Sequence, residues 1–477
     1  MSSTPYWVAG QRATSNEHVE VRSPYDGSLA GITSNATRSD VERAVEQAHS
    51  VRHEVAALPA HVRSAALDNV SRRLAERAEE FAALISAESG KPILWARAEV
   101  NRAISTFRWA AEEARRLSGE LQRLDTDPAS TGRLALVRRV SRGAVLGITP
   151  FNFPLNLVAH KVAPAIASGS PIVLKPAPAT PLTALLLGEL LSETDLPAGA
   201  WSVLPLANEA AGALVDDPRL PVVSFTGSGP VGWSIRDRVP RKHVTLELGG
   251  NAAAIVCPDW TDLDHAAQRI ATFATYQAGQ SCISVQRVYA HRDVHDELVE
   301  RIVTHVGKLG VGDPGDPATV VGPVINDAAA KRVQSWVDDA VAAGARVLIG
   351  GTRDGATVAP TVLADAPESC QVNADEIFGP VLTVTAVDSA DEAFDRVNAS
   401  RFGLQAGVFT RDVQLAFRAG TALDVGGVIV GDVPSYRADQ MPYGGVKESG
   451  VGREGLRSAI EDFTEPRVLV LTGLEFH

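Results

Sequence analysis

The sequence predicts an α/β fold with parallel sheets, and three observations support this prediction. Between residues 143 and 256, short β-branched runs such as "PIVLK", "PVVSF" and "AAIV" alternate with amphipathic segments such as "PLTALLLGELLSET". Such alternation is typical of βαβ units. A second alternating region extends to about residue 430, and the length of 477 residues fits two large domains or three of ordinary size.

The first third of the chain is predicted to be helical and to end in a hairpin. From residue 40 to about 117 the apolar residues recur at helical spacing. Pro59 suits a first helical turn, and the glycine and proline of "SGKP" at 89–92 separate two helices. A turn signal at 127–132 and the alternating stretch from Leu134 then predict an exposed, hairpin-like excursion.

The second alternating region is predicted to contain a further series of helices and strands. We expect a helix near 262–277, a strand near 284–290 and a helix near 293–308. The closing segment "EPRVLVLTGLEFH" predicts one last strand.

Composition and charge exclude several classes of protein. A formal net charge of −12 argues against nucleic-acid binding through the overall field. No apolar run of about 18 residues occurs. The N-terminus "MSSTPYWVAGQRATSNEH" also lacks the pattern of a signal peptide. We therefore expect a cytoplasmic protein with no nucleic-acid and no membrane partner.

The cysteines and histidines do not predict a metal site. Cys257, Cys282 and Cys370 are the only three cysteines, and none forms a CxxC motif, so neither a disulfide framework nor a zinc site is expected. The segment "HRDVH" places His291 and His295 four residues apart but lacks the glutamate of HExxH. Surface histidines are the better interpretation of this segment.

Four segments each hold a polar residue in an apolar or glycine-rich setting: "ITPFNFP", "VTLELGGN", "GQSC" and "EIFGP". Singly, each has a structural explanation. Cys282 suits a small buried side chain, Glu247 a charge at a strand end, and Asn152 a turn.

Together these segments resemble the aldehyde dehydrogenase superfamily. "LELGGN" and "GQSC" form the family's signature, and "PFNFP", "KPA", "FTGSGPVG", "EIFGP" and "PYGGVKESGVGREG" occur in the family's order. The resemblance runs from about Val21 to the C-terminus. It implies an NAD(P)-dependent enzyme that oxidises an aldehyde to the carboxylic acid.

The resemblance assigns the chemistry to three residues. Cys282 is the expected nucleophile, because a soft thiolate readily converts a carbonyl into a tetrahedral thiohemiacetal. The Asn152 side chain and the Cys282 backbone N–H are expected to stabilise its oxyanion. After hydride transfer a thioester remains, and Glu247 is the expected general base that activates water to hydrolyse it.

The segment "FTGSGPVG" contains a GxGxxG pattern at Gly227, Gly229 and Gly232, after the predicted strand "PVVSF". By itself this pattern is also compatible with a glycine-rich turn that opens a helix. The resemblance places the cofactor pyrophosphate at the N-terminus of that helix, beside Gly227 and Ser228.

The resemblance also implies the remaining cofactor contacts. Lys175 is expected at the adenosine ribose, and Glu376 and Phe378 at the nicotinamide ribose and ring. NAD-preferring relatives usually carry a glutamate where this chain has Pro178, so we expect NAD to work and NADP to be tolerated. The full expected set is Thr149, Pro150, Phe151, Lys175, Gly227, Ser228, Gly232, Leu248, Glu376 and Phe378.

The expected substrate is a small 2-hydroxy or anionic aldehyde. His160 stands where many relatives have a bulky aromatic residue, and Phe153 lies in the same segment. Arg102 and Arg108 lie on a helix that contributes to the tunnel mouth in relatives, and Arg453 lies in "GREG". We expect Phe153, His160 and Arg108 at the substrate, although helix arginines are mostly solvated or paired. The pattern resembles the branch with lactaldehyde, non-phosphorylating glyceraldehyde-3-phosphate, phosphonoacetaldehyde and sulfolactaldehyde dehydrogenases.

Three other functions are less compatible with the sequence. A CoA-acylating relative usually lacks the glutamate of "LELGGN", so Glu247 favours hydrolysis. A non-catalytic member of the fold could lose Asn152, Glu247 or Cys282, yet all three are present. A thiol hydrolase would need a Cys–His pair, and none is visible.

The resemblance also implies the domain organisation. A Rossmann-type NAD(P)-binding domain is expected over 1–120 and 143–250, and an α/β catalytic domain over 251–445. The excursion at 121–142 and the C-terminal segment 446–477 are expected to form a small β flap for oligomerisation. Exposed strand edges favour pairing with another subunit, in a homodimer or homotetramer.

Overall fold

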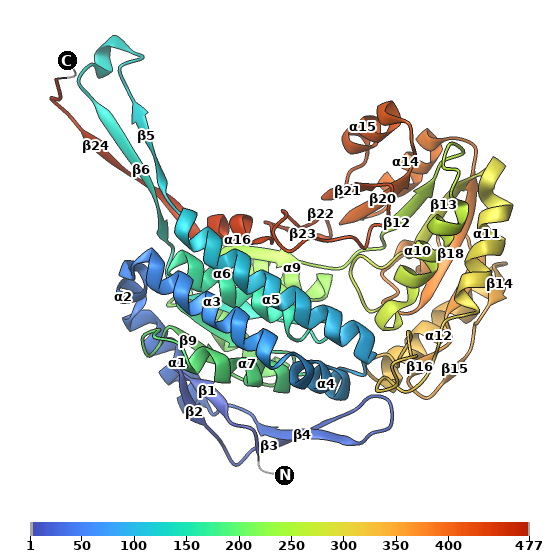
Figure 1. Cartoon of the computed structure of the whole chain (residues 1–477), viewed down its shortest axis with the longest axis horizontal. Coiled ribbons are helices and arrows are strands. Elements are labelled where there is room, and N and C mark those ends of the chain that lie inside the picture. The colour runs from blue at the N-terminus through green and yellow to red at the C-terminus, as the bar shows by residue number, and fades with distance from the viewer. Residues whose placement is uncertain (1–2, 476–477) are drawn as a thin grey trace.

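The computed structural model describes residues 3–475, in which two large sheets lie side by side with helices on their faces (Figure 1). Five parallel strands form the centre of the first sheet, and antiparallel strands extend both edges. In spatial order the strands are β2 (Gln11–Ala13), β1 (Tyr6–Val8), β9 (Trp201–Val203), β8 (Ile172–Lys175), β7 (Val145–Ile148), β10 (Val222–Thr226), β11 (His243–Glu247) and β23 (Gly450–Val451).

The strand order of the first sheet contains a switch point. From β7 the chain moves through β8 to β9 on one side, and it then returns to place β10 and β11 on the other side. In such sheets ligands bind beyond the carboxyl ends of the strands where the order reverses. The segments that follow β7 and β10 are therefore positioned at a binding crevice.

Helices cover both faces of the first sheet. Gly90 ends α4 in the left-handed conformation, with φ of 69°, and Pro92 directly precedes α5, which confirms the break predicted at "SGKP". The helices are α1 (Arg38–Ser50), α2 (Arg52–Ala57), α3 (Ala60–Glu76), α4 (Ala78–Ser89), α5 (Ile93–Arg116), α6 (Asn156–Ser168), α7 (Leu182–Ser192), α8 (Ala211–Asp216), α9 (Gly229–Arg238) and α16 (Leu456–Phe463), with a short 3-10 turn, η2, at Asn208–Ala210.

The second sheet is parallel except at one edge, where β14 runs antiparallel to β17. Its order is β14 (Arg346–Ile349), β17 (Thr361–Ala364), β18 (Val381–Val387), β13 (Arg287–His291), β12 (Ala253–Val256), β20 (Gln405–Phe409) and β21 (Gly427–Val430). The helices of this half are α10 (Leu263–Thr275), α11 (Arg292–Val306), α12 (Asp327–Ala342), α13 (Gln371–Ala374), α14 (Ala390–Asn398) and α15 (Val413–Ala422), with the turn η3 at Tyr276–Gly279.

The chain passes from the first sheet to the second between β11 and β12, in the segment "LGGNA". The helix predicted near 262–277 is α10 followed by η3, and the helix predicted near 293–308 is α11. The strand predicted near 284–290 begins later, at Arg287, because the preceding residues form the loop that follows η3.

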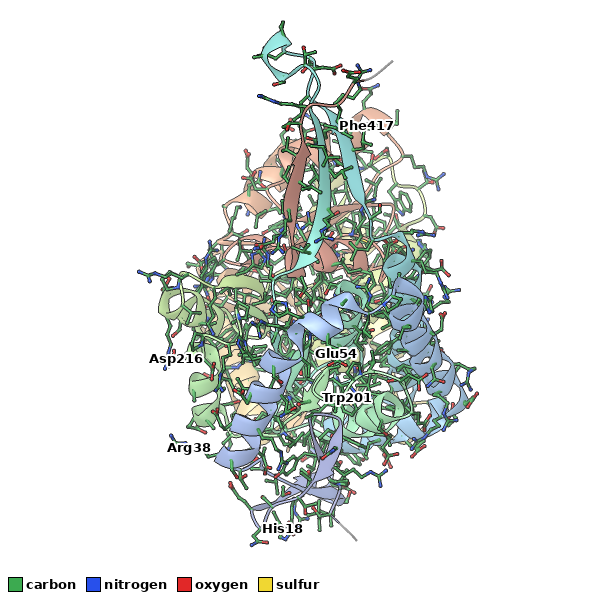
Figure 2. The ribbon with its side chains drawn as sticks, turned by 90° about the vertical axis from the view of Figure 1, so that its left-hand side faces the viewer. His18, Arg38, Glu54, Trp201, Asp216 and Phe417 are labelled. Atoms are coloured by element: carbon green, nitrogen blue, oxygen red, sulfur yellow. The ribbon has the colours of Figure 1, made fainter. Side chains whose placement is uncertain are left out.

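A third, antiparallel sheet projects from the body, with β6 at its centre and the C-terminal strand along one side (Figure 1). Figure 2 shows the same projection from the side. Its strands are β24 (Thr464–Leu471), β6 (Leu134–Ser141) and β5 (Gly119–Arg123), with the turn η1 at Pro128–Ser130. Of residues 446–477, only β24 is a strand of this sheet, because β23 pairs with β11 and α16 packs against α5 and α6.

Three two-stranded ribbons complete the fold: β3 (His18–Arg22) with β4 (Leu29–Ser34), β15 (Arg353–Asp354) with β16 (Thr357–Val358), and β19 (Phe402–Gly403) with β22 (Val446–Lys447). Over residues 3–475, none of the helices combines the length and apolar character needed to cross a bilayer.

Candidate active site

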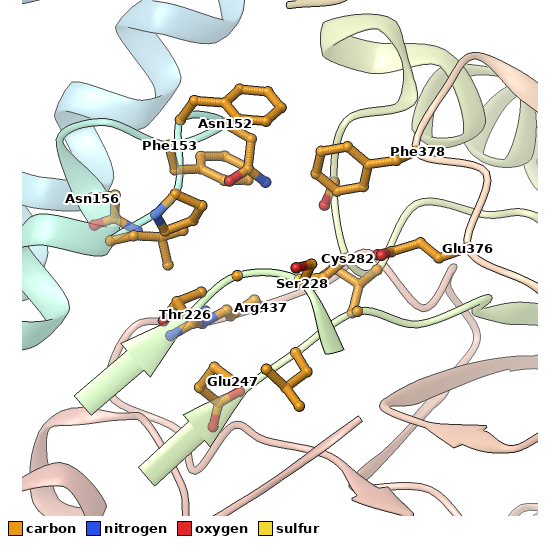
Figure 3. Close-up of a pocket in the computed structure, with 18 of the residues that line it drawn as sticks. Asn152, Phe153, Asn156, Thr226, Ser228, Glu247, Cys282, Glu376, Phe378 and Arg437 are labelled. Carbon is orange, nitrogen blue, oxygen red and sulfur yellow. The ribbon is translucent and has the colours of Figure 1, made fainter. Parts of the chain in front are cut away.

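Two adjoining cavities lie at the switch point of the first sheet. The first, of about 330 Å³, is lined from β10, β11, α5, α6 and loops of the second half of the chain (Figure 3). The second, of about 730 Å³, lies over the ends of β7, β8 and β10. The two share Pro150, Phe151, Thr226, Gly227 and Ser228 as lining residues. The two cavities therefore share one wall.

Cys282 lies in the first cavity, on the loop that follows η3. Gln277, Ala278 and Gly279 just before it have φ of 41°, 57° and 69°, a left-handed run that turns the chain sharply. A Cβ at Gly279 would lie 2.0 Å from the Gly379 carbonyl oxygen, so only glycine fits there. Burial raises the pKa of the Cys282 thiol to about 12, and a hydrogen bond with a tyrosine opposes this rise.

Glu247 is the last residue of β11, and only 3% of it is exposed. Neither carboxyl oxygen of Glu247 has a hydrogen-bond partner among the described residues. Burial, and then the negative charge of Glu454, raise the pKa of Glu247 well above its ordinary value. A buried, unpartnered carboxyl group that lines a cavity is a candidate acid–base catalyst.

Asn152 follows β7 and also lines the first cavity. Its Nδ2 donates to the carbonyl oxygen of Gln280 at 2.9 Å, which ties it to the Cys282 loop. The second Nδ2 hydrogen remains available to an oxygen atom in the cavity. The structure thus brings Asn152, Glu247 and Cys282 to one cavity, from three distant parts of the chain (Figure 3).

Lys175 ends β8 and lines the second cavity, where Nζ donates to Asn208 Oδ1 at 2.9 Å. Burial lowers the pKa of Lys175 to about 8, and the negative charge of Glu209 opposes the shift. The N-terminal residues of α9 line the same cavity, and a helix N-terminus attracts anions through its free N–H groups. Thr149 Oγ1 is buried there and has no hydrogen-bond partner in the described part of the chain.

The ten residues expected at the cofactor fall into three groups. Thr149, Pro150, Phe151, Lys175, Gly227 and Ser228 line the second cavity, whereas Leu248, Glu376 and Phe378 line the first. Gly232 lines neither cavity. It packs α9 against β11, where a Cβ would lie 2.5 Å from Leu248 Cδ2.

Glu376 and Phe378 stand at the junction of the two halves of the chain. Glu376 Oε1 accepts a hydrogen bond from the Gly250 N–H at 3.1 Å. Burial raises the pKa of Glu376 to about 7. Phe378 has φ of 47°, and its ring meets the Phe151 ring edge-on with centroids 5.9 Å apart. Phe151 lines both cavities and Phe378 lines the first, so this aromatic pair lies where the two cavities adjoin.

Of the three residues expected at the substrate, only Phe153 lines the first cavity. Arg108 is exposed, and its guanidinium lies 5.6 Å from the Trp109 ring centroid. His160 is buried behind the cavity wall, with Nε2 3.0 Å from Asp439 Oδ1. Burial, and then the charge of Arg437, lower the pKa of His160, so its ring is neutral rather than cationic.

Three other arginines, Arg102, Arg332 and Arg437, line the first cavity, and Arg332 donates to the Ile377 carbonyl oxygen at 2.8 Å. Arg102 Nη2 lies 2.8 Å from Asp439 Oδ1, and the Arg102 guanidinium lies over the Phe153 ring. Arg437 comes from the loop after β21 and donates to Glu454 Oε2 at 3.0 Å. Sequence patterns missed Arg437 because "VPSYRADQMP" has no periodicity to set its direction. Arg453 donates to backbone carbonyl groups and does not line the cavity.

The histidines of "HRDVH" have local partners instead of forming a metal site. His291 accepts the Asp293 N–H at the start of α11, and His295 hydrogen-bonds Asp296. Within the described part of the chain, no group of three or more histidine, cysteine, aspartate or glutamate residues is arranged to hold a metal ion.

The fold places a cysteine in a cavity at the switch point of a largely parallel α/β sheet. The family model described as "Aldehyde dehydrogenase family" matches residues 7–469. The chain belongs to the aldehyde dehydrogenase family, and the α/β fold class predicted from the resemblance is confirmed.

Relatives with known names are similar over nearly the whole chain. A 3-sulfolactaldehyde dehydrogenase of Priestia aryabhattai is 42% identical over 98% of this chain and 97% of its own length. A lactaldehyde dehydrogenase of Methanococcus aeolicus is 34% identical over 95% and 97%.

Solved structures are similar to the same extent. Aldehyde dehydrogenase 21 of Physcomitrella patens, in complex with the reaction product succinate, has a TM-score of 0.97 and 43% identity, with 99% of each chain covered. The NADP-dependent glyceraldehyde-3-phosphate dehydrogenase of Bacillus halodurans, complexed with NADP, has a TM-score of 0.95 and 34% identity, covering 99% of this chain and all of that one.

Proposed function

We propose that this chain oxidises a small anionic or 2-hydroxy aldehyde to the carboxylic acid, with NAD or NADP as the hydride acceptor. One observation carries the proposal: the half-buried Cys282 shares a cavity with three arginines and with Glu247, whose carboxyl oxygens have no hydrogen-bond partner among residues 3–475. The relatives named for 3-sulfolactaldehyde and lactaldehyde, and the NADP-bound neighbour, support the same conclusion.

The residues of the second cavity suit a dinucleotide. Its Lys175 amine, the N-terminus of α9 and the orphaned Thr149 hydroxyl supply donors for ribose and phosphate oxygens. Glu376 and Phe378, at the first cavity, would hold the nicotinamide end. The bound cofactor supplies the acceptor for the hydride.

Cys282 begins the reaction. Its thiol is protonated at neutral pH, so the proton leaves before Sγ adds to the aldehyde carbon, and the carboxylate form of Glu247 accepts it. The carbonyl oxygen becomes an oxyanion, which the free Nδ2 hydrogen of Asn152 and the Cys282 N–H stabilise. Hydride loss from this adduct leaves a thioester on Sγ.

Glu247 then completes the reaction. It first releases the proton taken from Cys282 to solvent. Its carboxylate then takes a proton from water, the resulting hydroxide adds to the thioester carbon, and the C–S bond breaks to release the acid. Glu247 returns this second proton to the thiolate, which restores the neutral Cys282 thiol. The presence of Glu247 favours this hydrolysis over transfer of the acyl group to a second thiol.

The arginines give the first cavity a preference for anions. Arg102 pairs with Asp439, Arg437 and Lys161 both pair with Glu454, and Arg332 also lines the cavity. A carboxylate, phosphate or sulfonate group on the aldehyde would be a partner for these guanidinium groups.

The projecting sheet suits contact with a second copy of the chain. Val468, Leu469, Val470 and Leu471 of β24 are between 37% and 57% exposed, which is unusual for a continuous apolar run. We infer a homodimer or homotetramer in which this strand is covered. Light scattering coupled to gel filtration measures the assembly, and a monomer at micromolar concentration would contradict this inference.

NADH formation by the purified chain tests the proposed activity. With 3-sulfolactaldehyde, lactaldehyde, glyceraldehyde 3-phosphate, succinate semialdehyde and propanal, we expect kcat/KM for the anionic aldehydes to exceed that for propanal by about tenfold or more, which is ~1.4 kcal/mol. Cys282→Ala should abolish NADH formation, and mass spectrometry of quenched enzyme should find an acyl adduct on Cys282. Turnover by the alanine variant would contradict the mechanism, and equal use of propanal would contradict the substrate class.

A further inference from the structure

Tyr443 contacts the sulfur atom of Cys282. Its Oη lies 2.9 Å from Cys282 Sγ, and this is the one side-chain hydrogen bond of Sγ among the described residues. Tyr443 is 4% exposed, and it packs in a small apolar cluster with Ile283 and Leu404. Neither its phenol nor its ring has a part in the steps assigned above.

The position of Tyr443 is fixed from three sides. Its backbone N–H donates to the carbonyl oxygen of Glu454 at 2.9 Å, and the Glu454 N–H donates back to the Tyr443 carbonyl oxygen at 2.6 Å. The Arg437 guanidinium lies over the Tyr443 ring, 3.8 Å from its centroid. Because the guanidinium is itself held by Glu454, the ring and the cation form one unit.

The direction of the hydrogen bond follows from the chemistry of the two groups. Burial raises the pKa of Tyr443 well above its ordinary value, so the phenol keeps its proton. A thiolate can only accept a hydrogen bond, so the phenol is the donor whenever Cys282 is ionised. A cation over the ring draws electron density from it and strengthens the O–H donor.

We propose that Tyr443 is a positioning residue for Cys282: its phenol donates a hydrogen bond to the thiolate, stabilises that form and holds Sγ toward the cavity. The proposal rests on the proposed function only in taking Cys282 as the nucleophile. The other titratable and charged groups that act on Cys282 come from four different segments, and they are Glu247, Tyr276, Glu376 and Arg437.

The test is the pH dependence of Cys282 alkylation by iodoacetamide, without aldehyde or cofactor. In Tyr443→Phe the loss of a donor to the thiolate should move the profile to higher pH by about one unit, so that alkylation at a fixed lower pH is about tenfold slower. In turnover, kcat should fall more than KM changes. A merely structural tyrosine would leave the pH profile in place, so an unchanged profile or a shift to lower pH would overturn the proposal.

Tyr289→Phe is the matched control. Tyr289 is also buried, at 1% exposure, and its Oη contacts Arg287 and Glu368 away from both cavities. Its loss should leave the alkylation profile unchanged. A shift as large as that of Tyr443→Phe would make the effect nonspecific and overturn the proposal.

A fluorinated tyrosine placed at position 443 tests the same bond without removing it. Fluorine makes the phenol more acidic, so a stronger donor should move the alkylation profile to lower pH, opposite to Tyr443→Phe. This variant decides the question if Tyr443→Phe does not fold, and an unshifted profile would overturn the proposal. Because alkylation needs no aldehyde, NADH formation by the unaltered chain tests the proposed function separately.

Discussion

Glu247 and Glu454 line the same cavity and are equally buried, at 3% and 2% exposure, yet their pKa values move in opposite directions. Burial raises the pKa of Glu247, whose carboxyl oxygens find no hydrogen-bond partner within residues 3–475. Burial acts on Glu454 too, but the charges of Lys161 and Arg437 outweigh it and lower the pKa of Glu454 to about 2. The difference between the two pKa values comes from the partners of each carboxyl group and not from how deeply each group is buried.

This comparison separates two ends of one cavity. At the Glu247 end, neither Glu247 carboxyl oxygen has a hydrogen-bond partner among residues 3–475, so both are available to react with a substrate. At the Glu454 end, Arg437 pairs with Glu454, and Asp439 pairs with Arg102 and hydrogen-bonds His160. Although burial opposes ionisation, His160 and Arg102 hold the pKa of Asp439 well below its ordinary range. The Glu247 end is therefore suited to catalysis, whereas the Glu454 end, called here the fixed-charge end, holds side chains whose charges are paired.

Replacing each glutamate by glutamine should therefore have opposite results. Glu247→Gln should lower kcat by about 10²- to 10³-fold, because water then lacks its general base, and should leave the free energy of unfolding unchanged or higher. Glu454→Gln should lower the free energy of unfolding by ~3 to 5 kcal/mol, because Lys161 and Arg437 lose their buried counter-charge. NADH formation and urea unfolding measure the two effects. If both variants lost activity and stability alike, the two ends would not differ as described.

The pH dependence of unfolding sharpens the same contrast. Glu454 has a folded pKa of about 2 against an ordinary 4.5, so its contribution to stability is present above pH 4.5 and is lost as the pH falls toward 2. The contribution of Glu247 to stability has the opposite sign. Because the folded pKa of Glu247 is raised, its contribution is present below pH 4.5 and is lost as the pH rises. Between pH 4.5 and 2, Glu454→Gln should lose less stability than the unaltered chain. Parallel curves would contradict this assignment.

The fixed-charge end should also determine substrate preference. Arg102 lines the cavity, and Asp439 would keep His160 as a partner without it. Arg102→Met should lower kcat/KM by about 10- to 100-fold for anionic aldehydes, ~1.4 to 2.8 kcal/mol, with little change for propanal. Arg108→Met is the control on the same helix, since Arg108 is exposed and lines neither cavity. Equal losses of kcat/KM for anionic aldehydes and propanal would show that Arg102 does not recognise the anionic group of the substrate.

The sequence indicated the reactive end of the cavity better than the charged end. Asn152, Glu247 and Cys282 each lie in a short motif that resembles the family, and the resemblance therefore indicated them; the structure places them after β7, at the end of β11 and after η3. His160 lies on α6, in which every residue is buried, so periodicity cannot tell which face meets the cavity. Arg437 lies in a loop that has no periodic pattern. The direction of its side chain is set by contacts with Glu454 and His160, which lie elsewhere in the sequence.

The second cavity lacks a fixed negative charge. The charged residues among its described lining are Lys175 and Arg238, and Pro178 also lines it, at the position where the resemblance expects a glutamate in NAD-preferring relatives. NADP should therefore support turnover at more than about a thousandth of the NAD rate, a ratio of ~4 kcal/mol.

Introducing a negative charge at position 178 tests the same explanation of the cofactor preference. Pro178→Glu should lower kcat/KM for NADP by about tenfold with a smaller change for NAD, because like charges then meet at the ribose. Pro178→Gln, of the same size but neutral, should change both cofactors equally. If glutamate and glutamine had the same effect on NADP, charge at this position would not set the cofactor preference, and the shape of the cavity wall would be the remaining determinant.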